Sequence, residues 1–334
     1  MTAAPPIRSA DTTECGVVMI GRNEGERLRR CMDSCASASL RVYVDSNSTD
    51  GSRELARSKG VETVELDVSR GFTAARARNA GFARMLERRP DIEYVMFVDG
   101  DCEIVADWIP AALAALHARP DIVAVCGRRR ERFPEASIFN RLCDIEWNTP
   151  PGEAKAFGGD VVMRAAALRA AGGYREDLIA GEEPELCVRL REAGGRILRL
   201  ERDMTWHDAA MTRFGQWWKR NVRSGHAFAE GAALHGEPPE RHFVAETRRA
   251  VLWGAALPMA ILLAAIAQPR LLLLLLVYPV QWFRIGSRMA RDGLPIPWSY
   301  AAFLLLGRFP EAQGVLKLWL GRIAGRRSAL IEYK

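Results

Sequence analysis

Residues 94–103, YVMFVDGDCE, constrain the fold most, because an apolar run stops abruptly at two carboxylates. A short run of branched and aromatic residues bounded by turn formers predicts a buried strand. Asp99 and Asp101 lean to the same side of an extended chain, and Gly100 between them allows a sharp turn. Such a pair could hold a hard divalent cation, Mg²⁺ or Mn²⁺. The alternative is a solvated turn that caps the next helix, so the neighbouring segments must decide.

Three further candidate strands precede this one, at residues 15–21, 40–44 and 61–66, and polar loops follow the first two. A helical pattern follows the first strand, and another occupies residues 73–88. Strands that alternate with helices of about 10 to 15 residues predict a doubly wound, Rossmann-like, mostly parallel α/β sheet. Ligands of such sheets bind beyond the carboxyl ends of the strands. The polar loops therefore favour a functional site at that edge.

Charge is distributed unevenly over the 334 residues, a length that suggests about two domains. Residues 248–334 carry 12 Lys and Arg against 3 Asp and Glu, whereas the preceding residues carry 35 against 38. A body without a basic surface argues against nucleic acid as a partner, and the basic tail favours anionic lipid. Seven cysteines, an odd number without a CxxC pair, fit a reduced cytosolic compartment. Residues 1–13 show no secretory signal and are predicted to be a flexible leader.

Taken in order, the motifs of this chain resemble those of family 2 glycosyltransferases with the GT-A fold. The similar segments are IGRNEGERL (20–28), VDSNSTDGS (44–52), ARNAG (77–81), DGD (99–101), FGGDVVMRAAALRAAGGYRED (157–177) and GEEPELCVRLREAGGRI (181–197). The resemblance covers about residues 15–210 and implies a GT-A domain over residues 14–210. It also implies an inverting transfer of a sugar from a nucleoside diphosphate.

The resemblance assigns roles to individual residues of this sequence. The implied nucleotide-sugar-binding positions are Asn23, Glu24, Asp45, Asp50, Arg78, Asp99 and Gly100. Asp45 and Asp50 would accept hydrogen bonds from uracil and ribose, and Arg78 would contact the base or a phosphate. Ser46 replaces a second acid that the family often has, which weakens the assignment of uracil. The alternatives are helix N-capping for Asp50 and a surface ion pair for Arg78.

A cation is the implied partner of the diphosphate, because the chain has neither a P-loop nor a GxGxxG motif. The resemblance implies that Asp101 holds Mn²⁺ or Mg²⁺, with Asp99 and His207 as further ligands. His207 follows the candidate strand 197–200. The alternative for His207 is a histidine satisfied at the edge of the domain.

Glu183 stands where the family has its catalytic base, an aspartate, and Glu182 is the reserve candidate. Displacement at an anomeric carbon requires a group that takes the proton of the attacking hydroxyl, and a carboxylate suffices. The alternative is that both acids only begin the helix predicted at residues 184–193, where acids are favoured anyway.

The C-terminal part is predicted to be helical and membrane-associated. Residues 211–247 are expected to form aromatic and basic connecting helices, and residues 248–334 a hydrophobic hairpin with amphipathic helices. Residues 251–267 form a run of 17 uncharged residues, and residues 271–283 form a second run of 13. These lengths suit a tilted or re-entrant hairpin better than two full membrane spans. Flanking arginines place the catalytic body on the cytoplasmic side of an inner membrane. The alternative is a buried, soluble helical subdomain.

The sequence therefore predicts an inverting, metal-dependent glycosyltransferase on the inner face of a bacterial-type membrane. The expected donor is a nucleotide sugar, with a UDP-sugar preferred. The expected acceptor is a glycan or a polyprenyl-linked intermediate, as in exopolysaccharide or envelope glycan assembly. A nucleotidyltransferase is the first rival, although residues 21–24 do not form the Gly-rich, Lys-containing loop it would need. A catalytically silent membrane scaffold with the same fold is the second.

Overall fold

The computed structural model describes residues 14–67, 69 and 71–325. The predicted leader, residues 1–13, lies outside them, as do the last residues of the tail. The described chain divides into two compact units. The first runs to Ala210, except for Ile179–Gly181, which belongs to the second unit together with Met211 and the residues after it.

The first unit alternates strands and helices along its first half and becomes more irregular in its second half. Its first half comprises β1 (Cys15–Gly21), α1 (Glu26–Ser34), β2 (Leu40–Asp45), α2 (Ser52–Ser58), β3 (Glu62–Glu65), α3 (Ala74–Arg88) and β4 (Tyr94–Asp99). Its second half comprises β5 (Cys102–Ile104), α4 (Trp108–Ala118), β6 (Ile122–Glu131), the 3₁₀ turn η3 (Pro134–Ala136), α5 (Ile138–Glu146), β7 (Gly152–Ala154), β8 (Val161–Arg164), α6 (Ala165–Ala170), α7 (Glu182–Glu192) and β9 (Arg196–His207).

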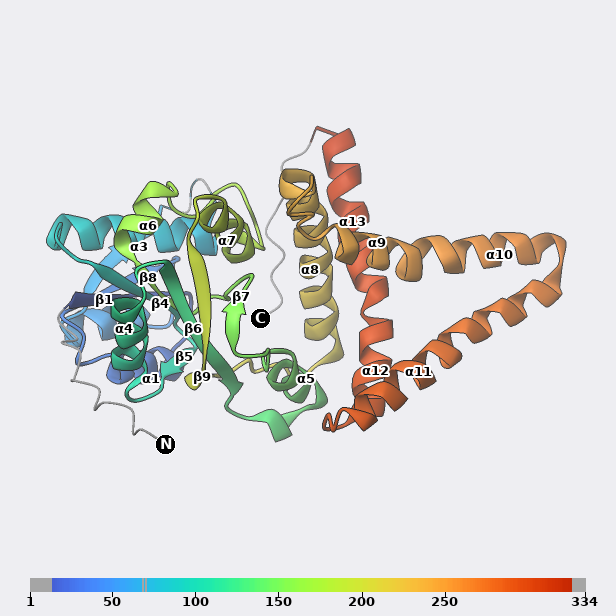
Figure 1. Cartoon of the computed structure of the whole chain (residues 1–334), viewed down its shortest axis with the longest axis horizontal. Helices are drawn as coiled ribbons and strands as arrows, with labels where there is room; N and C mark the ends of the chain where they lie inside the picture. Colours follow the sequence, from blue (N-terminus) through green and yellow to red (C-terminus); the bar gives the residue numbers. More distant parts are fainter. Residues whose placement is uncertain (1–13, 68, 70, 326–334) are drawn as a thin grey trace. The chain divides into compact units, whose positions relative to one another are not determined.

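The strands form one mixed sheet in the order β3-β2-β1-β4-β8-β6-β9-β5, with β7 paired to β9 (Figure 1). β3, β2, β1 and β4 are parallel to one another, and β8 runs antiparallel to both β4 and β6. β9 is parallel to β6 and antiparallel to β5 and β7. The mostly parallel half predicted from the sequence is therefore confirmed, and antiparallel strands complete the sheet.

Helices cover both faces of the sheet, as the two sides of β1 show. Val18 faces α3, where a Cβ on Gly81 would overlap with its side chain. Met19, the next residue, points to the opposite face, where its sulfur lies 3.7 Å from the Sγ of Cys35, the C-cap of α1. Gly81 therefore lets α3 approach the sheet closely. Arg78 lies on the same side of α3, one turn before Gly81.

The buried strand predicted to stop at the Asp-Gly-Asp turn is β4, which ends at Asp99, and Cys102 then begins β5 next to β9. Two other predicted elements differ from the observed ones. The helix predicted at residues 184–193 begins at Glu182, which places both candidate acids in its first turn. The strand predicted at residues 197–200 extends to His207, so this histidine ends a strand.

The second unit is helical. It comprises α8 (Phe214–His235), α9 (Val244–Val251), a π-helical turn η4 (Leu252–Ala256), α10 (Leu257–Ala267), the 3₁₀ segment η5 (Pro269–Leu276), α11 (Val277–Arg291), α12 (Pro297–Leu306) and α13 (Arg308–Ile323). α8 and α13 pack closely because a Cβ on Gly225 would overlap with the backbone of Glu311, and one on Gly314 with the backbone of Val222. This pair anchors the unit, and α9 and α10 lead away from it before η5 and α11 return (Figure 1).

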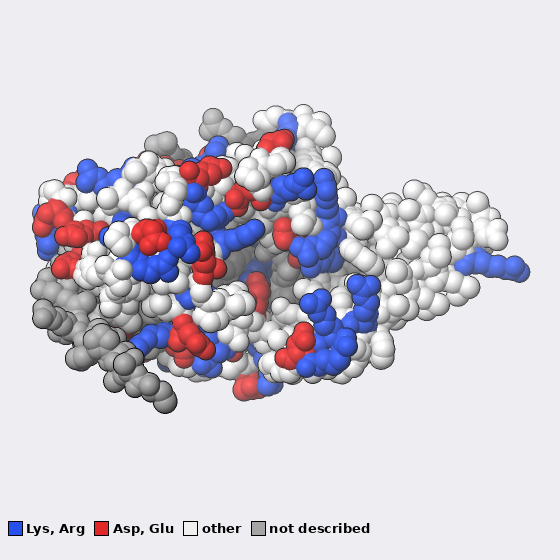
Figure 2. Space-filling model, viewed as in Figure 1, with Lys and Arg blue, Asp and Glu red and all other residues white. Residues whose placement is uncertain are grey.

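The arm, which we define as residues 252–283, exposes large apolar side chains. Ile266 is 81% exposed, Leu273 67% and Val280 65%, whereas Phe133 is the one such exposed side chain of the described first unit. Figure 2 shows almost no charge along this part of the surface. By length and composition, Val244–Ala267 is the one helix of the described chain that could cross a membrane. It has 24 residues, and its most apolar stretch of 18 residues has a mean hydropathy of 2.2 and little burial.

Candidate active site

The predicted site lies at the carboxyl edge of the parallel strands. The register pairs Gly21 with Asp45, and Ile20 with Asp99. The ends of β1, β2 and β4 are therefore level with one another, which brings their polar loops together. The convergence expected from the sequence is present.

The loops after β1 and β2 are tied to each other by side chains that were predicted to bind the donor. The backbone N–H of Asn23 donates to Ser48 Oγ over 2.9 Å, and the N–H of Thr49 donates back to Asn23 Oδ1 over 2.7 Å. The N–H of Gly25 donates to Asp50 Oδ2 over 2.9 Å. Although partial burial opposes it, hydrogen bonds from Ser52 and Gly25 lower the pKa of Asp50. Asn23 and Asp50 thus shape the loops, whatever they bind.

Asp45 is buried in the same region, and the chain itself uses both of its oxygens. Tyr43 donates its hydroxyl to Oδ1 over 3.0 Å, and the N–H of Ser48 donates to Oδ2 over 2.8 Å. Asp50 does not cap α2 in the usual way, because Gly51 is the N-cap residue. The N-capping alternative for Asp50 is therefore replaced by a contact with Ser52, whose N–H lies 3.1 Å away.

Glu24 and Gly100 meet behind the Asp-Gly-Asp turn. The N–H of Gly100 donates to the carbonyl of Ile20 over 2.8 Å, which fastens the turn to β1. A Cβ on Gly100 would lie 3.1 Å from that carbonyl oxygen and 3.3 Å from Cγ of Glu24. Glu24 also pairs with Arg27 at 2.8 Å. Gly100 therefore serves the close approach of the turn to β1.

Arg78 is the centre of the site, and it is buried rather than part of a surface ion pair. Its guanidinium lies 3.0 Å from Asp99 Oδ1, 3.0 Å from Glu182 Oε1 and 3.1 Å from Glu183 Oε1. Burial opposes its charge, but the carboxylates of Glu183 and Asp99 outweigh that and raise the pKa of Arg78. One cation thus holds together the end of β4 and the start of α7, which are far apart in sequence.

The other oxygen of Asp99 contacts a second arginine, which the sequence did not single out. Arg129 Nη2 lies 3.1 Å from Asp99 Oδ2 and 2.8 Å from Asp160 Oδ2. Asp160 is fully buried; it accepts from the backbone N–H of Asp99 and from the Thr205 hydroxyl. Asp99 is therefore clamped between two guanidinium groups.

The two candidate bases differ in exposure. The Glu182 side chain is 3% exposed, and its Oε2 has no hydrogen-bond partner among the described residues. The Glu183 side chain is 17% exposed. Burial and the adjacent Glu182 carboxylate raise the pKa of Glu183 to about 7, against the opposing effect of Arg78. Glu183 is thus the more accessible of the two acids.

Asp101 and His207 form a separate pair beside this network. Asp101 Oδ2 lies 3.3 Å from His207 Nε2, and both side chains are almost fully buried. The pair arises because β5 lies against β9 with Cys102 opposite His207. The ring of His207 also makes an edge-to-face contact with Trp147, at 4.9 Å between centroids.

The described residues offer two sets of potential metal ligands at this edge, rather than the single predicted set. Asp101, Cys102 and His207 form one, and Asp99, Cys102 and Asp160 form the other. Burial raises the pKa of the Cys102 thiol well above its usual value, so it stays protonated. The structure brings Asp101 and His207 together, as predicted, but groups Asp99 with Asp160.

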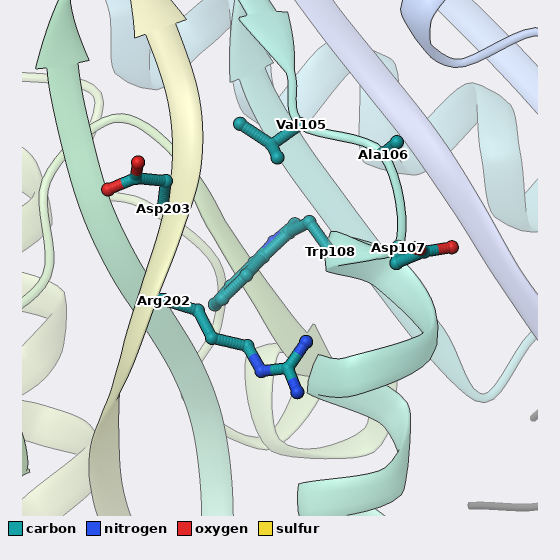
Figure 3. Close-up of a pocket in the computed structure, with 6 residues that line it drawn as sticks. All are labelled: Val105, Ala106, Asp107, Trp108, Arg202 and Asp203. Carbon is teal, nitrogen blue, oxygen red and sulfur yellow. The ribbon is translucent and has the colours of Figure 1, made fainter.

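The residues that sequence reasoning missed are Arg129, Glu131, Asp160 and Cys102. Arg129 and Glu131 are two residues apart on β6, so they lie on the same face of the sheet. This spacing within the basic run is the sequence feature that could have indicated them. Asp160 follows Gly158-Gly159, and a Cβ on Gly159 would overlap with Asp99 Oδ2. A cavity of about 160 Å³ lies elsewhere, against Trp108 and Arg202 (Figure 3), and no predicted site residue lines it.

Comparison with known proteins gives the following matches. Residues 16–176 match Glycosyl transferase family 2. The chain is similar to the pre-mycofactocin glycosyltransferase of Mycobacterium tuberculosis, in strains CDC 1551 / Oshkosh and ATCC 25618 / H37Rv, with 27% identity over 261 residues. The match covers 74% of this chain and 52% of the relative, so the chain spans about half the length of these curated relatives.

Solved structures match over more of their length. A mannosyltransferase from Pyrobaculum calidifontis, solved in complex with GDP-Man and Mn²⁺, matches with a TM-score of 0.62 and 22% identity, over 94% of this chain and 90% of its own. Glucosyl-3-phosphoglycerate synthase from M. tuberculosis, solved with Mn²⁺, UDP and glucosyl-3-phosphoglycerate, matches with a TM-score of 0.50 and 16% identity, over 71% and 88%. These likenesses confirm the predicted fold class.

Proposed function

The chain carries a family 2 glycosyltransferase domain with the GT-A fold, and from this premise we propose that it transfers a sugar, with inversion, from a UDP-sugar to a hydroxyl of a lipid-linked glycan acceptor. The observation that carries the proposal is the buried Arg78, which joins the predicted base Glu183 to Asp99. A base and the first acid of the Asp-Gly-Asp turn are thereby held in one network of contacts, as a single displacement requires.

The proposed step is a direct displacement at the anomeric carbon. The acceptor oxygen forms a bond to that carbon, and the bond from the carbon to the diphosphate oxygen breaks with its electron pair leaving on the diphosphate. Glu183 takes the proton of the acceptor hydroxyl. The raised pKa of Glu183 suits this role, because a general base is most effective when its pKa lies near the working pH.

The potential metal ligands beside this network suit Mn²⁺ or Mg²⁺. Asp101 and His207 would hold the cation, which when bound would neutralise the departing diphosphate. Their facing atoms are 3.3 Å apart, close to the spacing of about 3 Å between adjacent ligands of a small octahedral ion. Two solved neighbours contain Mn²⁺, which supports this assignment.

The nucleotide of the donor is proposed to occupy the loops after β1 and β2, near Asn23, Asp45 and Asp50. The neighbours were solved with GDP-Man and with UDP, so both bases occur on this fold. We retain uracil, and a panel of UDP- and GDP-sugars tests that choice directly.

The lipid-linked acceptor and a location at the cytoplasmic face of an inner membrane are supported by the second unit. The helix Val244–Ala267 is long and apolar enough to cross a membrane, and its 17 uncharged residues 251–267 extend over about 26 Å, close to the thickness of about 30 Å of a hydrocarbon core. A groove of about 420 Å³ between α11, α12 and α13 is lined by apolar and aromatic side chains and could take a hydrocarbon chain. Arg248 and Arg249 precede the arm and Arg284 follows it, which favours the cytoplasmic side for both ends.

The test is an assay of the purified full chain in detergent with radiolabelled nucleotide sugars, MnCl₂ and a membrane lipid extract. We expect release of the nucleoside diphosphate and transfer of label to the lipid fraction. Label that appears only in water-soluble product would contradict the lipid-linked acceptor. Release of pyrophosphate in a parallel assay with a nucleoside triphosphate and a sugar 1-phosphate would identify a nucleotidyltransferase, and no release in either assay would identify a silent scaffold.

Two pairs of variants assign the roles. Glu183→Gln should abolish transfer but still bind donor, whereas Glu192→Gln, at the exposed end of the same helix, should retain activity. Asp101→Asn should show no turnover at any Mn²⁺ concentration. Asp107→Asn, which alters the N-cap of α4, should keep a turnover that depends on added Mn²⁺. Full activity of Glu183→Gln or Asp101→Asn would overturn the role given to that residue.

A further inference from the structure

We propose that Glu131 is a positioning residue that sets the tautomer and orientation of His207, and thereby the affinity of the Asp101–His207 pair for a divalent cation. This inference rests on the cation site of the proposed function. Glu131 is absent from the motifs that carry the family resemblance, and its place becomes visible only through the pairing of β6, β9 and β5.

The three strands place Glu131, His207 and Cys102 side by side. Glu131 is opposite His207 in the parallel pairing of β6 and β9, and His207 is opposite Cys102 in the antiparallel pairing of β9 and β5. Residues directly opposite each other point to the same face of a sheet. His207 therefore lies between the Glu131 carboxylate on one side and the Asp-Gly-Asp turn on the other.

Glu131 is a buried acid whose two oxygens both act as acceptors. It is 1% exposed. Oε1 accepts from the backbone N–H of Phe133 over 3.1 Å and from Nδ2 of Asn140 over 3.2 Å. Oε2 accepts from the backbone N–H of Ala209 over 3.1 Å and faces Nδ1 of His207 at 3.6 Å. These donors hold the carboxylate in place, so it presents a rigid acceptor to the imidazole.

The imidazole is oriented by this arrangement. Nδ1 is buried, and no described residue forms a hydrogen bond with it, so Glu131 Oε2 at 3.6 Å is the acceptor that its proton faces. Nε2 lies 3.3 Å from Asp101 Oδ2, and a cation bound between them would take the place of the Nε2 proton while Nδ1 keeps its proton toward Glu131. A metal-binding histidine needs this neutral form, and a carboxylate behind the ring commonly selects it.

The competing explanation is that Glu131 only ties two loops to the sheet, because Phe133 and Ala209 each follow the end of a strand. The two explanations differ in what they predict for Glu131→Gln. The amide introduced by this substitution has one acceptor oxygen, so its NH₂ must face one of the two donor sets. If the NH₂ faces His207, it donates to Nδ1 and moves the ring proton to Nε2, which removes the lone pair that a cation needs.

The first measurement uses the unaltered full chain without added metal. Nitrogen NMR of the ¹⁵N-histidine-labelled protein reports which ring nitrogen carries the proton, and the signal of His207 is identified by its loss in His207→Asn. We expect Nδ1 to carry a proton, whether or not Nε2 also carries one, because Glu131 Oε2 faces Nδ1 and Asp101 Oδ2 faces Nε2. A ring in which Nδ1 is unprotonated would overturn the inference.

The second measurement is binding of Mn²⁺ alone, followed by the electron paramagnetic resonance of the free ion. Glu131→Gln should weaken binding about 10- to 100-fold, the range typical of residues behind a metal ligand. Asn140→Ala removes one bond to Oε1 but keeps the bonds from Phe133 and Ala209 and the Oε2 that faces His207, so it should weaken binding less than Glu131→Gln does. A Glu131→Gln protein that binds Mn²⁺ as the unaltered chain does, or an equal loss in Asn140→Ala, would refute the positioning role.

The same titration separates this inference from the proposed function. If His207→Asn and Asp101→Asn bind Mn²⁺ as the unaltered chain does, the cation site itself is wrong. If both weaken binding and Glu131→Gln does not, only the role of Glu131 fails.

Discussion

Replacement of Arg78 by methionine tests the central contact of the site. Methionine keeps an unbranched apolar side chain in the space of the arginine stem but removes the cation that holds Asp99, Glu182 and Glu183. Removal of one partner from a buried ion pair typically costs about 3–5 kcal/mol, because the charge left behind is uncompensated. With a urea dependence of about 2 kcal/mol per molar, the unfolding midpoint should fall by about 1.5–2.5 M.

The assay exploits the position of the cysteines. All seven are buried and lie in the first unit, so labelling with a short pulse of maleimide in urea reports the unfolding of that unit within the full chain. The loss of stability should depend on pH. Arg78 opposes the rise in the pKa of Glu183, so its removal raises that pKa further. An acid whose pKa is higher in the folded state than in the unfolded state destabilises the folded state when it is forced to ionise. At pH 6 Glu183 is mostly protonated in both proteins, whereas at pH 8 the variant must ionise it without Arg78. The stability lost in Arg78→Met should therefore be larger at pH 8 than at pH 6.

Arg164→Met is the matched control. Arg164 is also partly buried, but it donates to the carbonyls of Ile122 and Leu116 and to the hydroxyl of Tyr94, rather than to carboxylates. Its replacement should lower the stability without a pH dependence between these values. A loss below about 1 kcal/mol in Arg78→Met, the upper range of exposed ion pairs, would refute the buried network, and so would an equal loss at both pH values.

Three further predictions concern catalysis and location. First, kcat/KM should fall as the pH drops below about 7, because Glu183 must be ionised to accept a proton; a flat profile between pH 6 and 8 would exclude it as the base. Second, Gly159→Ala should lose activity, since its Cβ would overlap with Asp99 Oδ2, whereas Gly158→Ala meets no described atom within 4 Å and should stay active; equal activities would contradict this packing. Third, Ile266→Asp should reduce flotation with anionic vesicles, while Phe133→Asp, which alters the exposed apolar side chain of the first unit, should not; unchanged flotation of both would count against the arm as the membrane contact.

The parallel half of the sheet could be predicted because its signals are local. β1 and β2 are short apolar runs bounded by polar loops, and their observed ends differ from the predicted ones by at most one residue. The long β9 could not be predicted in full, because its second half reads ERDMTWH and alternates only weakly. Its strand conformation there follows from pairing with β6 and β5, which is a tertiary effect.

In the candidate site, too, the residues in local motifs could be predicted and those placed by strand pairing could not. The resemblance supplied Glu183, Arg78 and the Asp-Gly-Asp turn, because each stands in a recognisable segment. It could not supply Glu131 or Arg129, because their contacts depend on which strands become neighbours in the sheet.

The two aspartates of the turn show why spacing alone misleads. On an extended chain they would lean to the same side and share one ion. Instead, the hydrogen bond from Gly100 to Ile20 turns the chain between them. Asp99 then ends β4 and meets two arginines, while Asp101 precedes β5 and is carried to His207 by the pairing with β9. One aspartate therefore organises the protein's own cations and the other faces the place where a bound cation is proposed, a division of roles that a motif of three residues cannot express.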